Sequence, residues 1–478
     1  MGRMLLKVLS DPEVEKMHDR TLELFETVGV KVTHDEALKK LAKAGAKVNA
    51  STGSVRFPRE MVGELLALAP SVGVETGLNG KVLEIGGDNR YYGSLVTDPF
   101  IIDYNTGPRR PVLEDIRRNT IIGESLDRVD MISRMQFPVA DISGADSCYK
   151  TMEVVLTHTS KSVSSPPTSE ENCRDWMDVM AVIADAAGLD VMNTPLTHIM
   201  MAVTSPLQLH APNVEMMKMA MERCYPIFPT ICPMAGTTSP YTVAGTALVT
   251  NAENLLVVLV AQVYKPGHPV FYGAGPSVTD MKTGCDLYYK AEKMLFKIAA
   301  TQMGKYYNLP VKGEAAGTLT YRPDVQNGAE GALYLLASVV GGQNGVGGLG
   351  SLHNAVGMSA EQIVMQCGLA DMVEYVARGI DMSDHKLGLS SIDRVGPGGN
   401  FLMDDLTLEL LRSDEFFESP YLDLTGGYED DRPGIHEIAH QKLDEFVNNY
   451  KPTVGDKVQA AIKDFFLKKY QNKKVADL

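Results

Sequence analysis

The chain of 478 residues is short of several patterns, and each shortage excludes a class of protein. Its six cysteines are scattered without a C-x-x-C pair, which excludes a zinc-finger framework and predicts reduced thiols in a cytoplasmic protein. Lys and Arg number 45 against 60 Asp and Glu, and this formal net charge of −15 argues against a nucleic-acid partner. No apolar run reaches about 18 residues, so we expect no membrane span. The N-terminus also turns acidic before a signal-peptide core can form.

A regular alternation of short apolar runs with longer segments of helical spacing begins near residue 112. This pattern is typical of a parallel sheet built from βα units, and eight strands close a TIM-type barrel. The sequence therefore predicts an α/β fold with a (β/α)8 barrel over residues 111–399. An α+β cap over residues 1–110 and a helical extension over residues 400–478 complete the predicted domains. The eight predicted strands are 132–137, 162–165, 197–203, 227–232, 269–273, 311–315, 344–349 and 386–390.

Two short motifs match known sites but lack the context that those sites require. His436 and His440 lie in a literal H-E-x-x-H, the helical zinc site of metallohydrolases, but no distinct third ligand stands out. A polar first turn of a helix explains the motif better, so we predict no metal site here. Residues 345–350 spell G-x-G-x-x-G inside a predicted strand, and no helix follows at once. A dinucleotide fingerprint opens a helix directly, so close backbone approach is the better explanation of these glycines.

From about residue 15 to 455 the chain resembles the trimethylamine methyltransferase superfamily of corrinoid-dependent methyltransferases. The segments that carry the resemblance are 103–111 (DYNTGPRRP), 204–207 (TSPL), 233–240 (PMAGTTSP), 251–253 (NAE), 266–270 (PGHPV), 359–362 (SAEQ) and 396–399 (GPGG). The resemblance implies a TIM barrel that passes a methyl group from an amine to the Co(I) corrinoid, a cobalamin, of a separate small protein. It further implies that the chain binds no cofactor of its own and forms a homo-oligomer.

The chain departs from the founding members of this superfamily where they carry pyrrolysine. The matching position is near Thr318, an ordinary residue. Members without pyrrolysine resemble the quaternary-amine branch, whose best-known activity converts glycine betaine to dimethylglycine. A second departure is Leu406, where many relatives have His. The loss of an added electrophile fits a quaternary ammonium, since its leaving group is already a neutral amine and needs no general acid.

A barrel enzyme acting on such a substrate needs aromatic faces for the ammonium and donors for a carboxylate. Aromatic candidates at strand ends are Phe137 and Tyr272, although only one of Phe271 and Tyr272 can point inward. Glu314, in a strand rich in Gly and Ala, is the natural partner of a cationic substrate. Candidate donors near strand ends are Gln208, His210, Asn344 and His353. Each has a structural alternative as a core or loop residue, and the sequence offers no convincing nucleophile.

Four hypotheses remain open at this point. The first is methyl transfer from glycine betaine, and the second is the same reaction on proline betaine, carnitine or a related quaternary amine. A zinc hydrolase using His436 and His440 is the third, and a barrel that only binds a betaine is the fourth.

Overall fold

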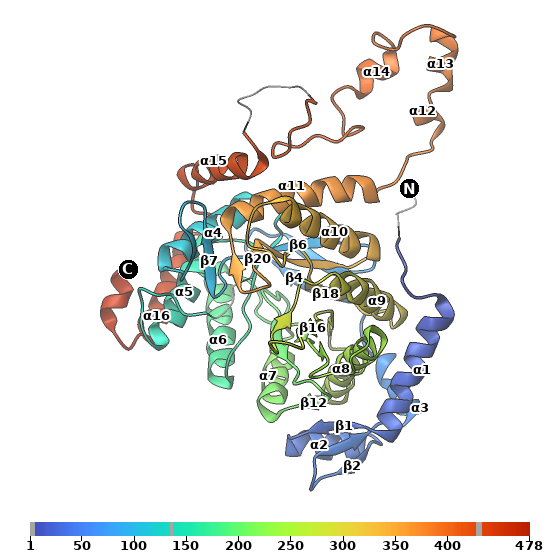
Figure 1. The fold of residues 1–478 in the computed structure, drawn as a ribbon. Helices are drawn as coiled ribbons and strands as arrows, with labels where there is room; N and C mark the ends of the chain where they lie inside the picture. Colours follow the sequence, from blue (N-terminus) through green and yellow to red (C-terminus); the bar gives the residue numbers. More distant parts are fainter. Residues whose placement is uncertain (1–4, 134–136, 427–432) are drawn as a thin grey trace.

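The centre of the computed structural model, which describes residues 5–133, 137–426 and 433–478, is a barrel of parallel strands (Figure 1). Around it the pairing runs β10-β9-β6-β19-β18-β15, a single bridge between Ile227 and Val270 joins β15 to β13, and β13 pairs with β11. The described residues thus form eight parallel strands, which confirms the predicted barrel. They are β6 (Tyr91–Leu95), β9 (Met131–Ser133), β10 (Ser162–Ser164), β11 (Ile199–Ala202), β13 (Ile227–Thr230), β15 (Tyr272–Gly273), β18 (Val311–Glu314) and β19 (Gly345–Leu349).

A helix follows each barrel strand and packs outside it, as the βα pattern requires. Caps predicted by residue type begin several of these helices; the Ser359 side chain, for example, accepts the backbone N–H of Gln362 at the start of α11. The eight helices are α4 (Leu113–Ser125), α5 (Ala145–His158), α6 (Glu170–Ala187), α7 (Ala211–Glu222), α8 (Val243–Tyr264), α9 (Glu292–Tyr306), α10 (Val325–Gly341) and α11 (Ala360–Ala377). By length and composition α8 could cross a membrane, but 72% of its most apolar window is buried in the fold, where α1, α2, α3 and α9 contact it.

Seven of the predicted strands have counterparts in the barrel, and the eighth prediction is wrong. Residues 386–390 lie in two short helices, α12 (Asp384–Leu387) and α13 (Leu389–Val395), because Gly388 adopts φ +63° and caps the first of them. The missing strand is β6, which lies between β19 and β9. The barrel therefore begins before residue 111, inside the segment assigned to the cap. The predicted strand 132–137 continues into residues 134–136, which lie outside the described part of the chain.

A hairpin closes the N-terminal end of the barrel. It consists of β4 (Val72–Thr76) and β5 (Val82–Gly86), paired antiparallel. Its backbone N–H groups donate hydrogen bonds to the carbonyls of Pro195, which precedes β11, and Ser160, which precedes β10. The hairpin therefore lies at the gap between β10 and β11, the two neighbouring barrel strands that are not paired with each other. Leu83 and Ile85 of the hairpin pack with Phe228 and Phe271 in one buried cluster. The only wide mouth left to the barrel in the described residues is at its C-terminal end.

Two small sheets stand at this C-terminal end. One joins β14 (Met234–Ala235), β16 (Ser277–Thr279) and β17 (Asp286–Leu287); the other joins β20 (Ser351–Leu352), β21 (Gly357–Met358), β7 (Phe100–Asp103) and β8 (Gly107–Arg109). Both are built from the loops that follow barrel strands, the usual location of a barrel active site.

The chain ends lie outside the barrel. The N-terminal part contains α1 (Asp11–Thr27), β1 (Val30–Val32), α2 (Asp35–Lys43), β2 (Lys47–Asn49), β3 (Ser54–Arg56) and α3 (Arg59–Leu66). Its sheet also takes in β12 (Gln208–Leu209) from the loop after β11. At the other end, α15 (Ile435–Asn448) packs on α11 and α4, α16 (Asp456–Leu467) packs on α6 and α5, and the turn η1 (Lys473–Asp477) follows.

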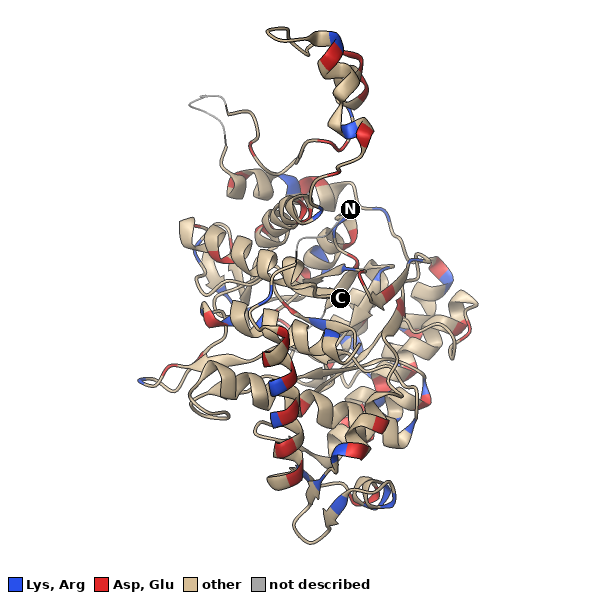
Figure 2. Ribbon diagram, turned by 90° about the vertical axis from the view of Figure 1, so that its right-hand side faces the viewer, with Lys and Arg blue, Asp and Glu red and all other residues tan. Residues whose placement is uncertain are grey.

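Between α11 and α15 the chain extends away from the barrel as an arm that holds α12, α13 and α14 (Asp405–Leu410) (Figure 1). Several apolar side chains of the arm are largely exposed, Ile380 at 82% and Leu389 at 74% among them. In the view of Figure 2, acidic and basic residues are interspersed along the outer helices.

Candidate functional site

A cavity of about 140 Å³ lies inside the barrel, toward its C-terminal mouth. It is far smaller than the roughly 300 Å³ or more of sites for drug-sized ligands, so it suits a small molecule. Apolar and small side chains form most of its wall. The lining comes from every barrel strand or the residues beside it: Gly93, Leu95, Met131, Ser133, Ser164, His198, Met200, Phe228, Pro229, Thr230, Ile231, Cys232, Ala274, Gly275, Tyr288, Lys312, Gly313, Glu314, Gly347 and Gly348.

Glu314 is the carboxylate of this wall, at the C-terminal end of β18. Gly348 on the neighbouring strand makes room for it, since a Cβ at Gly348 would lie 2.3 Å from Glu314 Cγ. The same glycine adopts φ +87°, which disfavours any other residue there. Asp98 lies near enough for the charge of Glu314 to add to burial in raising the pKa of Asp98 well above its usual range.

Two buried lysines of α9 stand behind the wall at this level. Lys293 Nζ donates to the carbonyls of Gly275 and Pro276, and it lies 3.2 Å from the ring centroid of Tyr288. Lys297 Nζ donates to the carbonyl of Ala274. Burial lowers the pKa of Lys293 to about 8 and that of Lys297 further, and the charge of Glu314 opposes both shifts. The lysines therefore hold the backbone of the wall, and Lys293, whose pKa stays near 8, offsets part of the negative charge of Glu314.

Cys232 also lines the cavity but is a poor nucleophile. Burial raises the pKa of its thiol to about 11. Because the thiolate is the reactive form, Cys232 stays protonated and unreactive at neutral pH.

The floor of the cavity holds a buried polar triad. Glu75 of the closing hairpin is fully buried, and its Oε1 lies 2.6 Å from Lys312 Nζ and 3.0 Å from His198 Nδ1. Its other oxygen accepts the hydroxyl of Ser162. His198 and Lys312 together hold the pKa of Glu75 far below its usual range despite burial, so Glu75 is ionised. Burial lowers the pKa of His198, which keeps the ring neutral at pH 7.

Of the residues predicted from the sequence, the cavity includes Glu314 alone. Tyr272 is buried on the outer side of its strand, where its hydroxyl donates to Asn251, because its neighbour Phe271 takes the inward direction. Asn344 stands at the start of β19 and bonds to the backbone of Gly87, Asn89 and Val311, a structural role at the closed end. These two placements correct the predictions.

The remaining predicted residues also lie off the cavity wall. Gln208 is in the small N-terminal sheet, and His210 caps α7. His353 adopts φ +54° in the loop after β20, beside Tyr321, and Phe137 is half-buried. Thr318, near the position of pyrrolysine in relatives, is buried and accepts a hydrogen bond from Asn327.

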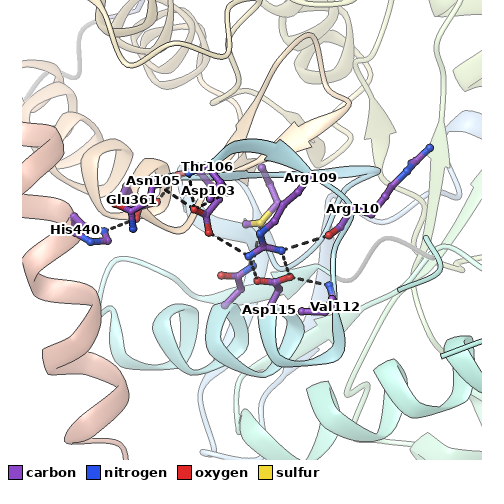
Figure 3. Close-up of polar contacts among 12 residues, drawn as sticks. Asp103, Asn105, Thr106, Arg109, Arg110, Val112, Asp115, Glu361 and His440 are labelled. Atoms are coloured by element: carbon purple, nitrogen blue, oxygen red, sulfur yellow. Dashed lines mark hydrogen bonds and ion pairs between the residues drawn. The ribbon is translucent and has the colours of Figure 1, made fainter. Parts of the chain in front are cut away.

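The H-E-x-x-H motif lies at the start of α15 and has other partners. His440 Nδ1 is 2.8 Å from Glu361 (Figure 3). Its ring stacks on that of Tyr104, with the ring centroids 3.8 Å apart. His436 also packs on Tyr104. In the described residues, a cluster of three side chains of metal-ligand type, with ligand atoms within 4.8 Å of one another, is formed by His34, Glu36 and Glu215. Lys218 forms ion pairs with both carboxylates of this cluster.

Comparison with known proteins gives one family over almost the whole chain. The family model of trimethylamine methyltransferase (MTTB) matches residues 2–473. The trimethylamine methyltransferase MttB of Desulfitobacterium hafniense (strain DSM 10664 / DCB-2) is 28% identical over 95% of this chain and 92% of its own length. The glycine betaine methyltransferase of D. hafniense (strain Y51) is 25% identical over 95% and 96%. The crystal structure of the Methanosarcina barkeri monomethylamine methyltransferase MtmB shares the fold, with a TM-score of 0.53 and 12% identity over 93% and 89% of the two chains.

Proposed function

Because the chain belongs to the trimethylamine methyltransferase (MTTB) family, we propose that it transfers a methyl group from a quaternary amine to the Co(I) corrinoid of a partner protein. The preferred substrate of this proposal is glycine betaine, which gives dimethylglycine. A relative named for that substrate matches the full length of the chain, as do relatives named for trimethylamine. Proline betaine, carnitine and other quaternary amines are the alternatives within the same reaction.

The observation that carries the proposal is Glu314 in the wall of a small, largely apolar cavity. The hydroxyls of Tyr288 and Tyr289 hydrogen-bond to this carboxylate, and a cation in the cavity would stabilise its charge further. The ring of Tyr288 and that of Phe228 line the same space, and aromatic faces attract an ammonium by about 0.5–2 kcal/mol each. A permanently charged ammonium of small size meets all three requirements.

The reaction needs positioning more than acid or base. The carbon–nitrogen bond breaks with its electron pair passing to nitrogen, and the carbon–cobalt bond forms from the electron pair of Co(I), which is oxidised to Co(III). No proton is taken up or released, so the tertiary amine leaves without a general acid. The protein holds the ammonium by its charge, aligns one methyl group with the open mouth of the barrel, and excludes water.

The absence of pyrrolysine from the sequence fits this substrate. Thr318, near that position in relatives, has a structural hydrogen bond and no electrophilic group. The cavity thiol is protonated, as its raised pKa of about 11 requires. A substrate that brings its own activation as a quaternary ammonium therefore suits the chain better than trimethylamine. The protein is expected to act in the cytoplasm, because its six cysteines are scattered without a C-x-x-C pair, as in proteins of reducing compartments.

The proposal is tested by following the absorbance of cob(I)alamin as it converts to methylcob(III)alamin. The substrates are glycine betaine, proline betaine, carnitine, choline and trimethylamine, each with and without the cognate corrinoid protein. Turnover of one quaternary amine and none of trimethylamine supports the proposal and identifies the substrate. Turnover of trimethylamine alone overturns the quaternary assignment, and no turnover of any amine with the corrinoid protein present overturns the function.

A further inference from the structure

The arm between α11 and α15 is polar inside and apolar outside, the reverse of the usual pattern in a folded chain. Between residues 379 and 412, all of which the structure describes, the two buried side chains are Ser391 and Asp404. Asp404 accepts hydrogen bonds from the hydroxyl of Ser391 and from Arg394, and so ties α13 to α14. The large apolar side chains lie outside instead. Six of those in the arm are between 71% and 82% exposed: Ile380, Leu389, Leu402, Met403, Leu411 and Phe416.

The helices of the arm are too short to be stable by themselves. α12, α13 and α14 have 4, 7 and 6 residues, whereas isolated helices below about 12 residues are marginal in water. The structure describes all three helices, and none of them has a buried apolar side chain. One chain therefore gives the arm no apolar core, and the surface of another protein must supply it.

The arm leaves and rejoins the body of the protein at the closed end of the barrel. Near the end of α11, Glu374 is 2.8 Å from Arg90, which precedes β6 at this end. One turn later, Arg378 donates to the carbonyls of Asp414 and Glu415, where the chain returns from the arm. A partner that brings a corrinoid must reach the mouth at the opposite end of the barrel. Such a partner leaves the arm uncovered.

The arm has a hollow at its root and a projection at its tip. The hollow, here called the root groove, has a volume of about 430 Å³, and Tyr375, Ile380 and Phe416 form part of its wall. The tip is the turn over residues 396–403 that joins α13 to α14 at the far end of the arm, where Leu402 is exposed (Figure 1). A contact between two identical copies about a two-fold axis requires a surface that complements itself. Two arms that lie antiparallel meet this requirement, because the tip of each then reaches the root groove of the other.

The exposed apolar area is sufficient for a stable dimer. A large apolar side chain presents about 60–120 Å² when it is exposed, so the six side chains present on the order of 500 Å² on each arm. If each arm covers an equal area on the other copy, the contact buries on the order of 2,000 Å² in total, where the range of obligate homodimers begins.

We propose that the arm is the dimerisation element of this protein. Each arm packs antiparallel along the arm of a second copy, with its tip in the root groove of that copy. The proposal does not depend on the methyl-transfer reaction.

Two charge substitutions, one on each side of the contact, test the proposal by light scattering over a range of protein concentrations. The wild-type protein should contain an even number of 52.0 kDa chains. Ile380→Lys places a charge in the root groove and Leu402→Asp places one at the tip. Each should raise the Kd of the dimer at least about 100-fold and halve the mass, because a charge then enters an apolar contact twice in each dimer. Both side chains are largely exposed in one chain, so neither change disturbs the packing of its own barrel.

A mixture of the two variants distinguishes this arrangement from other contacts between copies. In a mixed dimer, one contact brings the introduced lysine to the introduced aspartate, and the other contact keeps the native Ile380 and Leu402. The mass should therefore return to the wild-type value on mixing. A mixture that keeps the halved mass overturns the proposal, and so does a wild-type mass in either single variant.

Val28→Lys and Val325→Asp are the matched controls. These valines are 64% and 89% exposed, and both lie outside the arm. Val28 ends α1 and Val325 begins α10, so each introduced charge suits its helix end. Both controls should leave the Kd of the dimer within about twofold of the wild-type value. A loss of the dimer in the controls equal to that in the arm variants overturns the proposal.

Hydrogen exchange of the wild-type protein covers the case in which the arm variants do not fold. The amides of α12, α13 and α14 should exchange at least about tenfold more slowly in the dimer than in the dissociated chain, while those of α8 should not change. A wild-type protein that is one chain at every concentration overturns the proposal, as do unprotected arm amides in an oligomer. Protection that appears only when the corrinoid protein is added overturns it as well and assigns the arm to that partner.

Discussion

The replacement Glu314→Gln tests whether the cavity is a cation site. It keeps the shape of the side chain and removes its charge. The methyl groups of a quaternary ammonium keep its nitrogen about 5 Å from a carboxylate oxygen, where two charges interact by about 3 kcal/mol at an effective dielectric constant near 20. Glu314 is half-buried, and Lys293, whose pKa is about 8, offsets part of its charge. We therefore expect a loss of about 1.5–3 kcal/mol, which raises the KM for glycine betaine about 10- to 150-fold.

The effect on kcat should be much smaller. The substrate loses positive charge as its amine departs, so Glu314 stabilises the bound ammonium at least as strongly as the transition state. Removing such an interaction raises KM and leaves kcat almost as it was, and we expect a change below about threefold. The assay is cob(I)alamin methylation over a range of substrate concentrations, with a thermal melt to establish that the variant is folded.

Two comparisons sharpen this experiment. Inhibition by 3,3-dimethylbutanoate, the carbon isostere of glycine betaine, which has no ammonium, should weaken little in Glu314→Gln, so the preference of the protein for betaine over this isostere should collapse. Asp178→Asn removes the same charge from the outside of α6, where the carboxylate is 46% exposed beside Arg223, and should change neither constant. A large fall in kcat with KM unchanged would mean that Glu314 acts on the reaction itself, and would refute the assignment as a cation partner.

Three further predictions follow from single contacts. Gly348→Ala should abolish most activity by displacing the Glu314 side chain, whose Cγ would lie 2.3 Å from the new Cβ. Gly267→Ala, at a similar φ of +81° but with nothing within 4 Å, should cost only stability, and kcat/KM and thermal melts distinguish the two variants. Glu75→Gln should lower the unfolding free energy by about 3–5 kcal/mol in urea titrations because it leaves Lys312 buried and uncompensated, and Glu75→Gln with Lys312→Met should recover part of this loss. Burial, helped by the charge of Lys265, lowers the pKa of His268 to about 4 in the folded protein. In the unfolded chain the same ring is protonated at about pH 6.5, so between these two pH values the unfolded state binds one proton more than the folded state. Stability should therefore fall as pH drops through this window, by about 3 kcal/mol at most, and the urea midpoint of His268→Gln should fall less between pH 7 and pH 4.5.

The sequence was sufficient for most of the barrel because buried parallel strands are short, continuous apolar runs. It failed at one strand, where two candidates had similar local patterns. Residues 386–390 contain the apolar Leu387 and Leu389 but lie in the exposed arm, while β6 reads YYGSL and lies in the barrel wall. Neither segment contains a signal for its burial; the pairing of β6 with β19, more than two hundred residues later, decides it. Tertiary contacts of this kind override local propensity.

The site was harder to predict than the fold because strand ends identify a face of the barrel but not the direction of a side chain. At 271–272 the alternation of a strand allowed one aromatic residue to point inward, and no local pattern favoured Phe271, which packs against Gly73 of the hairpin. Glu314 was predicted for a chemical reason, a carboxylate in an apolar strand, and it does line the cavity. The chemical criterion therefore identified a residue of the cavity wall, whereas position at a strand end did not.

The direction of Lys312, two residues before Glu314 on β18, could also have been predicted from the sequence. Side chains two residues apart on a strand share a face, so an inward Glu314 places Lys312 inward as well. A buried ammonium requires an anion, and this demand can be read from the sequence V-K-G-E alone. The anion itself cannot, because Glu75 is 237 residues away in a hairpin whose position depends on the gap between β10 and β11. Sequence can therefore state what the floor of this cavity needs, and only the closed barrel shows that Glu75 meets this need.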